Sequence, residues 1–124
     1  MKLHAQYKMS NKKYMVTLSL IKFKEDKAAI IYSPALDLSG YGNTFEDAKK
    51  SFSTTLQEFI KYTHNKRTLE TCLIKMGWKI KQGKQKVNFV PPKETDLIKK
   101  NSLYTDIVNN KEYSVMRQNV EFAL

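Results

Sequence analysis

The stretch from Thr44 to Ile60 constrains the fold most, because its apolar residues recur with the period of an amphipathic helix. Thr44 is a good N-cap residue, and the acids Glu46 and Asp47 place negative charge in the first helical turn. We therefore predict one main helix that begins at Thr44 and buries one face. The apolar positions of that face are Phe45, Ala48, Phe52, Leu56, Phe59 and Ile60.

Three strand-like segments precede this helix. Residues 14–23 alternate as a half-buried strand does, but the apolar side changes face partway along, which indicates a bulge or a bend. Residues 28–32 follow a polar turn and should pair with the first strand as a hairpin. Residues 36–41 are expected to form a third strand, with Gly40 and Gly42 giving the backbone freedom to turn into the helix.

Further elements follow the main helix. A polar break at residues 63–67 leads to a shorter helix that Gly77 closes, and then to a hairpin about Gly83. Residues 93–110 have the pattern of one or two short helices, and residues 112–123 that of a strand. The sequence therefore predicts an α+β protein with an antiparallel sheet. The side chains expected to face inward from the hairpin are Trp78, Ile80, Val87 and Phe89.

The chain has the size and apolar content of one domain. Its 124 residues, 41% of them hydrophobic, can close a single core. We divide it into a basic N-terminal segment (residues 1–13), an α+β domain (residues 14–90) and a helix–strand extension packed on the same domain (residues 91–124).

The sequence is typical of a cytoplasmic protein. The single cysteine, Cys72, excludes an internal disulfide, and the apolar run around it predicts a buried thiol. The N-terminus lacks the apolar stretch of a secretory signal, and no run approaches the roughly 20 apolar residues of a membrane span.

Charge is distributed unevenly along the chain. The formal net charge is +10, yet six acids and three lysines lie between Glu25 and Glu58, so that segment carries −3 and the remainder +13. Two surfaces of opposite character are therefore expected, one suited to a basic partner and one to an anionic partner.

Between the second strand and the main helix the chain contains a motif made of Tyr32-Ser33-Pro34-Ala35-Leu36, Gly40, Gly42, Thr44, Glu46, Asp47 and Ala48. This arrangement resembles the strand, loop and capped helix of the HicB antitoxin family. The resemblance covers roughly residues 14–62 and implies a partial ribonuclease H-like fold, in which an antiparallel sheet carries one main helix. It also implies a non-catalytic protein that binds and neutralises a small, basic, RNA-cleaving toxin of the HicA type encoded beside it.

The chain departs from that family in two places. The Pro-Gly-Cys often seen in the loop is replaced by Asp37-Leu38-Ser39-Gly40. Residues 93–124 resemble neither a helix-turn-helix nor a ribbon-helix-helix, the two modules with which many family members bind operator DNA. The resemblance therefore implies toxin capture, whereas it gives no support for direct operator binding and leaves that question open.

No constellation of residues points to catalysis. A ribonuclease H active site gathers carboxylates around two metal ions, whereas residues 14–23 hold no acid and Asp37 stands alone beside a strand. His4 and His64 have no cysteine or second histidine at ligand spacing. We expect no enzyme activity, no metal and no cofactor.

Three binding functions remain open. In the first, Asp37, Glu46 and Asp47 contact a basic toxin. In the second, the chain is a corepressor whose hairpin meets phosphates of nucleic acid, although lysines on a strand can equally well serve solubility. In the third, it is a homo-oligomer that pairs through the terminal strand at residues 113–122. The candidate nucleic-acid contacts are Lys79, Lys81, Lys84 and Lys86.

Overall fold

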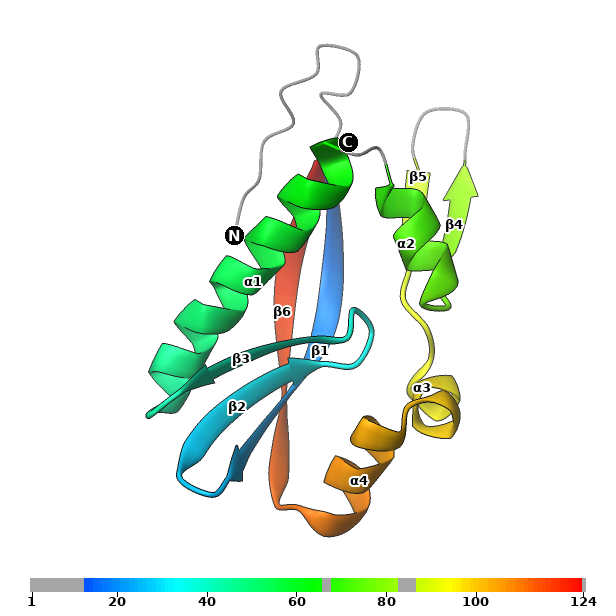
Figure 1. Cartoon of the computed structure of the whole chain (residues 1–124). Coiled ribbons are helices and arrows are strands. Elements are labelled where there is room, and N and C mark those ends of the chain that lie inside the picture. The colour runs from blue at the N-terminus through cyan, green and yellow to red at the C-terminus, as the bar shows by residue number, and fades with distance from the viewer. Residues whose placement is uncertain (1–12, 66–67, 83–86, 124) are drawn as a thin grey trace.

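The computed structural model describes residues 13–65, 68–82 and 87–123, and it shows an α+β protein. Strands and helices alternate in groups along the chain (Figure 1). The elements are β1 (Lys13–Glu25), β2 (Ala28–Ser33), β3 (Leu38–Gly42), α1 (Phe45–Asn65), α2 (Leu69–Lys75), β4 (Lys79–Gln82), β5 (Val87–Val90), α3 (Glu94–Lys100), α4 (Ser102–Asn110) and β6 (Tyr113–Ala123).

The main sheet is antiparallel and has the strand order β3-β2-β1-β6. The three expected N-terminal strands are confirmed, with Ile21 opposite Tyr32 in the β1–β2 pair and Ile31 opposite Gly40 in the β2–β3 pair. The last strand lies beside the first, since β6 pairs with β1 from Lys13 to Phe23. Residues 113–123 are therefore part of the same sheet as residues 13–25.

The helix α1 covers one face of this sheet. Thr44 caps it as expected, because its Oγ1 accepts the N–H of Asp47 at 3.1 Å. The apolar stripe predicted from the sequence is the buried one, and Phe52, Leu56 and Ile60 are almost fully enclosed. They share one core cluster with Leu18, Leu20, Ala29 and Ile31 of the sheet.

The opposite face of the sheet carries a second, smaller core. Ile21, Phe23, Ile30 and Tyr32 pack there against Tyr104 and Ile107 of α4. Of the bulge or bend expected in the first strand, the bulge is absent, because the pairing of β1 with β6 runs from Lys13 to Phe23 without an extra residue. The apolar side changes face because α1 covers one face of β1 and α4 covers the other face near its end.

The later hairpin, β4–β5, is a separate two-stranded sheet beside the main one. Trp78 anchors it, since its Nε1–H donates to the carbonyl oxygen of Ala35 at 2.7 Å and its ring is buried. Phe89 is buried and Ile80 half-buried, as predicted, whereas Gly83 and the side chain of Val87 lie outside the described residues. The hairpin therefore joins the main core through its inward residues.

The thiol of Cys72 is less enclosed than the sequence predicted. The buried stripe of α2 consists of Leu69 and Leu73, one helical turn apart. Cys72 lies beside that stripe and is half-buried.

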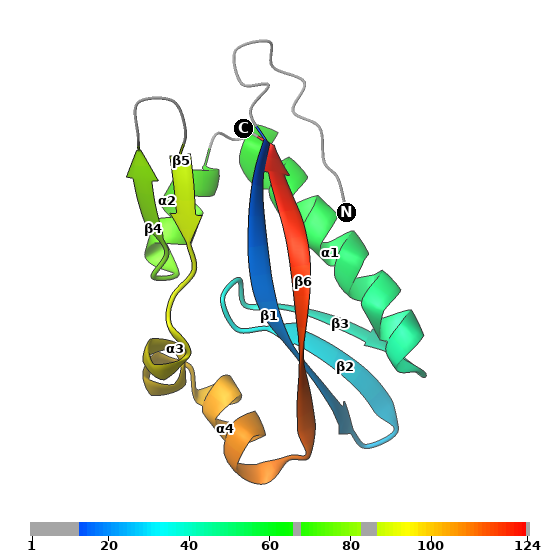
Figure 2. The ribbon, with the colours of Figure 1, turned by 180° about the vertical axis from the view of Figure 1, so that it is seen from behind.

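Part of the sheet face opposite α1 is open. Figure 2 shows β1 and β6 in front, with no helix across the half of these strands nearest the marked C-terminal end. Met15 is 64% exposed on this face, and Thr17 Oγ1 donates to Asn119 Oδ1 at 2.7 Å across the two strands. Among the helices of the described residues, none combines the length and the apolar character of a membrane span.

Candidate partner-binding site

Asp37 lies in the turn between β2 and β3 and takes part in a structural hydrogen-bond network. Its Oδ1 accepts the hydroxyl of Tyr32 at 2.7 Å, and that hydroxyl also accepts Nδ2 of Asn101 at 2.7 Å. Asn101 in turn caps α4, because its Oδ1 accepts the N–H of Tyr104. Asp37 has a φ of 54°, a left-handed conformation that aspartate tolerates better than most residues. The network ties this turn to the helices of the tail.

Burial shapes the acid–base chemistry of this network. Desolvation raises the pKa of the Tyr32 hydroxyl well above its ordinary value, the hydrogen bond from Asn101 opposes that shift, and the Asp37 carboxylate adds to it. Tyr32 is therefore neutral at physiological pH and can donate its proton to Asp37. Because Asp37 itself is exposed, its carboxylate remains accessible to a partner.

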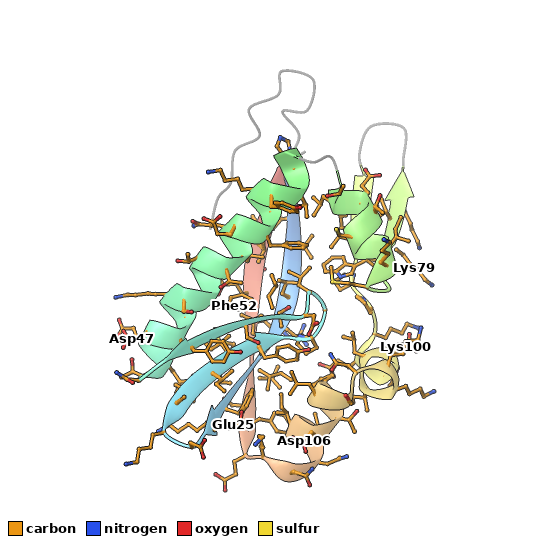
Figure 3. The ribbon with its side chains drawn as sticks, in the orientation of Figure 1. Glu25, Asp47, Phe52, Lys79, Lys100 and Asp106 are labelled. Carbon is orange, nitrogen blue, oxygen red and sulfur yellow. The ribbon has the colours of Figure 1, made fainter. Side chains whose placement is uncertain are left out.

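Glu46 and Asp47 lie at the other end of β3 from Asp37. Both are exposed in the first turn of α1, and Asp47 points away from the sheet in Figure 3. The structure therefore divides the three predicted carboxylates between the two ends of one strand and does not gather them into a single cluster. A partner would have to lie along β3 and the start of α1 to reach all three.

The three carboxylates differ from Glu25 in their contacts with lysines. Within the described ranges, Asp37, Glu46 and Asp47 form no ion pair, while Lys111 Nζ contacts Glu25 Oε1 at 3.3 Å. Surface carboxylates without an ion pair can form one with a basic partner.

Two lysines that the sequence reasoning did not single out lie close to the start of α1. The ammonium groups of Lys22 and Lys24 lie 4.8 Å and 6.0 Å from the centre of the Phe45 ring. Their alternate positions in the first strand could have indicated that they share a face, but not that this face meets Phe45. The surface around Glu46 and Asp47 is therefore of mixed charge.

The basic hairpin is only partly described. Lys79 and Lys81 are exposed on alternate residues of β4, with half-buried Ile80 between them. Lys79 points outward at the side of the molecule in Figure 3. Lys84 and Lys86 lie outside the described residues. The two described lysines thus share one solvent-facing side of the hairpin, as the strand pattern predicted.

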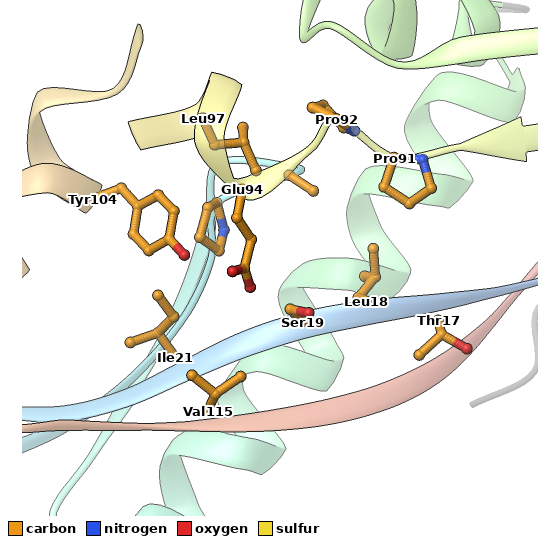
Figure 4. A pocket seen from close by; sticks show the side chains of 12 residues that line it. Thr17, Leu18, Ser19, Ile21, Pro91, Pro92, Glu94, Leu97, Tyr104 and Val115 are labelled. Carbon is orange, nitrogen blue, oxygen red and sulfur yellow. The ribbon is translucent and has the colours of Figure 1, made fainter. Parts of the chain in front are cut away.

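A pocket of about 220 Å³ lies where the open sheet face meets the segment after β5. Its walls come from five parts of the chain, with Leu18, Pro34, Pro92, Tyr104 and Val115 as one residue from each, and Glu94 projects into it (Figure 4). The apolar walls and the single carboxylate suit an aliphatic or basic side chain of a partner. No local sequence signal could have revealed it, because the walls meet only in the folded chain.

Tyr104 forms the end of this pocket nearest α4. Burial raises the pKa of its hydroxyl, and the negative charge of Glu94 adds to that effect.

Within the described part of the chain, no three histidine, cysteine or acidic side chains are placed to hold a metal ion. The chain matches no family model, no curated protein and no solved structure.

Proposed function

We propose that this chain is a HicB-type antitoxin, a non-catalytic protein that binds and neutralises a small, basic, RNA-cleaving toxin. The observation that supports this function best is the set of exposed carboxylates beside β3 and on α1, which have no ion pair among the described residues. The motif between Tyr32 and Ala48, which resembles the HicB family, contains these same carboxylates.

Charge decides how such a complex would form. Antitoxin and toxin would both be basic, so their net charges repel at long range. Attraction has to come from a local patch within about one Debye length, roughly 8 Å at physiological salt. Glu46 and Asp47 supply two adjacent negative charges at such a patch, and Asp37 supplies a third at the far end of β3.

Reversing the two adjacent charges tests the proposal. The variant Glu46→Lys/Asp47→Lys is expected to bind the product of the neighbouring small open reading frame about tenfold more weakly, because it places lysines against basic side chains. Isothermal titration calorimetry measures the affinity, and co-expression measures the rescue of growth. Thermal unfolding of each variant shows that it is folded.

The matched control is Asp106→Lys/Glu112→Lys, which changes the net charge equally at exposed positions on α4 and beside β6. It should bind as the unmodified chain does. The proposal fails if the neighbouring gene product is not toxic, if it is not bound, or if both double variants weaken binding equally.

A second candidate function, a corepressor that contacts nucleic acid, is favoured by one observation: Lys79 and Lys81 share the exposed side of β4. The variant Lys79→Gln/Lys81→Gln should then bind promoter DNA of its own gene more weakly and lower the slope of log affinity against log salt by about 2. Gel-shift titration at several salt concentrations measures this. Lys99→Gln/Lys100→Gln, with two exposed lysines of α3, is the control. Absence of binding at low salt eliminates this function.

A further inference from the structure

The two edges of the main sheet are protected very differently. At one edge, β3 has five residues, and α1 packs closely against its glycines. At the other edge, β6 has eleven residues, and within the described part of the chain its only strand partner is β1. Edge strands in natural proteins are short, covered, or blunted by lysine or proline, because an open edge pairs with other strands. Among the described residues β6 has no strand partner beyond β1, and it contains no lysine and no proline; its charged residues are Arg117 and Glu121.

The side chains of β6 are accessible over most of its length. From Tyr113 to Asn119 all are exposed except Met116 and Gln118, which are half-buried. Tyr113 is 41% and Val115 52% exposed, and they lie opposite Phe23 and Ile21 of β1, on the same face of the sheet as Met15. An open backbone edge therefore adjoins a partly apolar, open sheet face.

The charge of β6 decides which partner suits this edge. The strand contains one arginine and one glutamate and is formally neutral, whereas the whole chain carries +10. Two copies of so basic a chain repel each other over most of their surface, and they can approach most closely where each is neutral. A strand that is also free along its edge lets identical copies pair antiparallel about a two-fold axis.

We propose that β6 is a homodimer interface, at which the β6 strands of two copies pair antiparallel and join their sheets into one continuous sheet. A two-fold axis perpendicular to the sheet keeps the same face of both copies on the same side. The exposed side chains of Met15, Tyr113 and Val115 from both copies then lie on one extended surface. This interface is independent of toxin capture, because Glu46 and Asp47 belong to α1 on the other side of the sheet.

Edge lysines test the interface directly. The variant Val115→Lys/Asn119→Lys places a lysine on each side of Arg117, on the same face of β6. Three positive charges then follow one another along the strand. If residues 115–119 of two copies pair, each possible register therefore places like charges opposite each other. The dissociation constant of the dimer should rise at least about tenfold, and analytical ultracentrifugation over a wide range of protein concentration measures it. For the unmodified chain, dimerisation should strengthen with salt, because salt screens the repulsion between the basic copies.

The matched control is Met15→Lys/Thr17→Lys. It adds the same two charges to the same open face and removes the same Thr17–Asn119 hydrogen bond, but one strand away from the edge. It should dimerise much more strongly than the edge variant. Hydrogen exchange of the unmodified chain gives a readout that needs no variant, since amides of residues 113–123 should exchange more slowly as concentration rises.

Three outcomes overturn the proposal. The first is that the unmodified chain sediments with the mass of one chain at every concentration and salt, which would leave the edge free or reserved for a different protein. The second is equal dissociation of the two double variants, which would place the interface elsewhere. The third is exchange of the β6 amides that is independent of concentration.

Discussion

Replacing Gly40 with alanine is expected to destabilise the protein by about 3 kcal/mol. A Cβ at this position would lie 2.3 Å from the backbone nitrogen of Phe52 and 2.4 Å from the carbonyl oxygen of Ala48. Both atoms belong to the backbone of α1, so no side-chain rotation relieves the clash. The helix has to move away from β3, which opens the core that Phe52 and Leu56 close. Urea unfolding followed by circular dichroism measures the change.

The control is Ser39→Ala, at the preceding, half-buried residue of the same strand. It shortens a side chain without adding an atom and should change the free energy of unfolding by less than about 1 kcal/mol. If Gly40→Ala were as stable as Ser39→Ala, the close packing of α1 on β3 would be wrong.

The role of Gly40 also shows what the sequence could not reveal. Backbone freedom at the turn into the helix was the expected reason for this glycine and for Gly42. Both lie within β3, however, and of the three glycines that the structure describes, Gly77 is the one with a positive φ. Their requirement is the absence of a side chain where α1 passes over the strand. Such a close approach depends on two elements that are brought together only by the fold. A capping residue, in contrast, acts within a single helix and can be recognised from the sequence of that helix.

Signals that act within one element were sufficient to predict most helices and strands. Thr44, Glu46 and Asp47 mark the start of α1, and its apolar period marks the buried face. The alternation in residues 14–23 predicted β1, but its change of face suggested a bulge or a bend because the sequence does not show that α4 covers the second face. The elements that cover each face of a strand are determined by the whole fold. The change of apolar face in residues 14–23 could therefore not be explained from the sequence alone.

The charge pattern of the sequence identified the acidic residues but did not predict how they are grouped on the surface. The segment from Glu25 to Glu58 is acidic in sequence, but the fold places Lys22 and Lys24 over Phe45, at the start of the helix that carries Glu46 and Asp47. Asp37 is drawn into the Tyr32–Asn101 network at the far end of β3. A net charge summed along a chain therefore predicts the presence of carboxylates and not their grouping.

Removing residues 111–124 is expected to abolish cooperative folding. The deletion takes away β6, which pairs with β1 over its length and contributes the fully buried Val120 to the main core. It leaves β1 as an unpaired edge and exposes Val16 and Leu18, which are buried in the complete chain. Thermal unfolding followed by circular dichroism should show no sharp transition. A truncated chain that still unfolds cooperatively would contradict the pairing of the first and last strands.

Two substitutions in β6 separate its role in folding from its role at an interface. Val120→Ala should lower the free energy of unfolding by about 2 kcal/mol, because it removes two buried methyl groups and leaves a cavity beneath α1. Val115→Ala should change that free energy by no more than about 0.5 kcal/mol, since its side chain is about half exposed on the open face. These costs are measured at a protein concentration where the chain is monomeric, so that dimerisation does not add to them. Equal effects of the two substitutions would mean that β6 does not present Val120 to the core and Val115 to solvent.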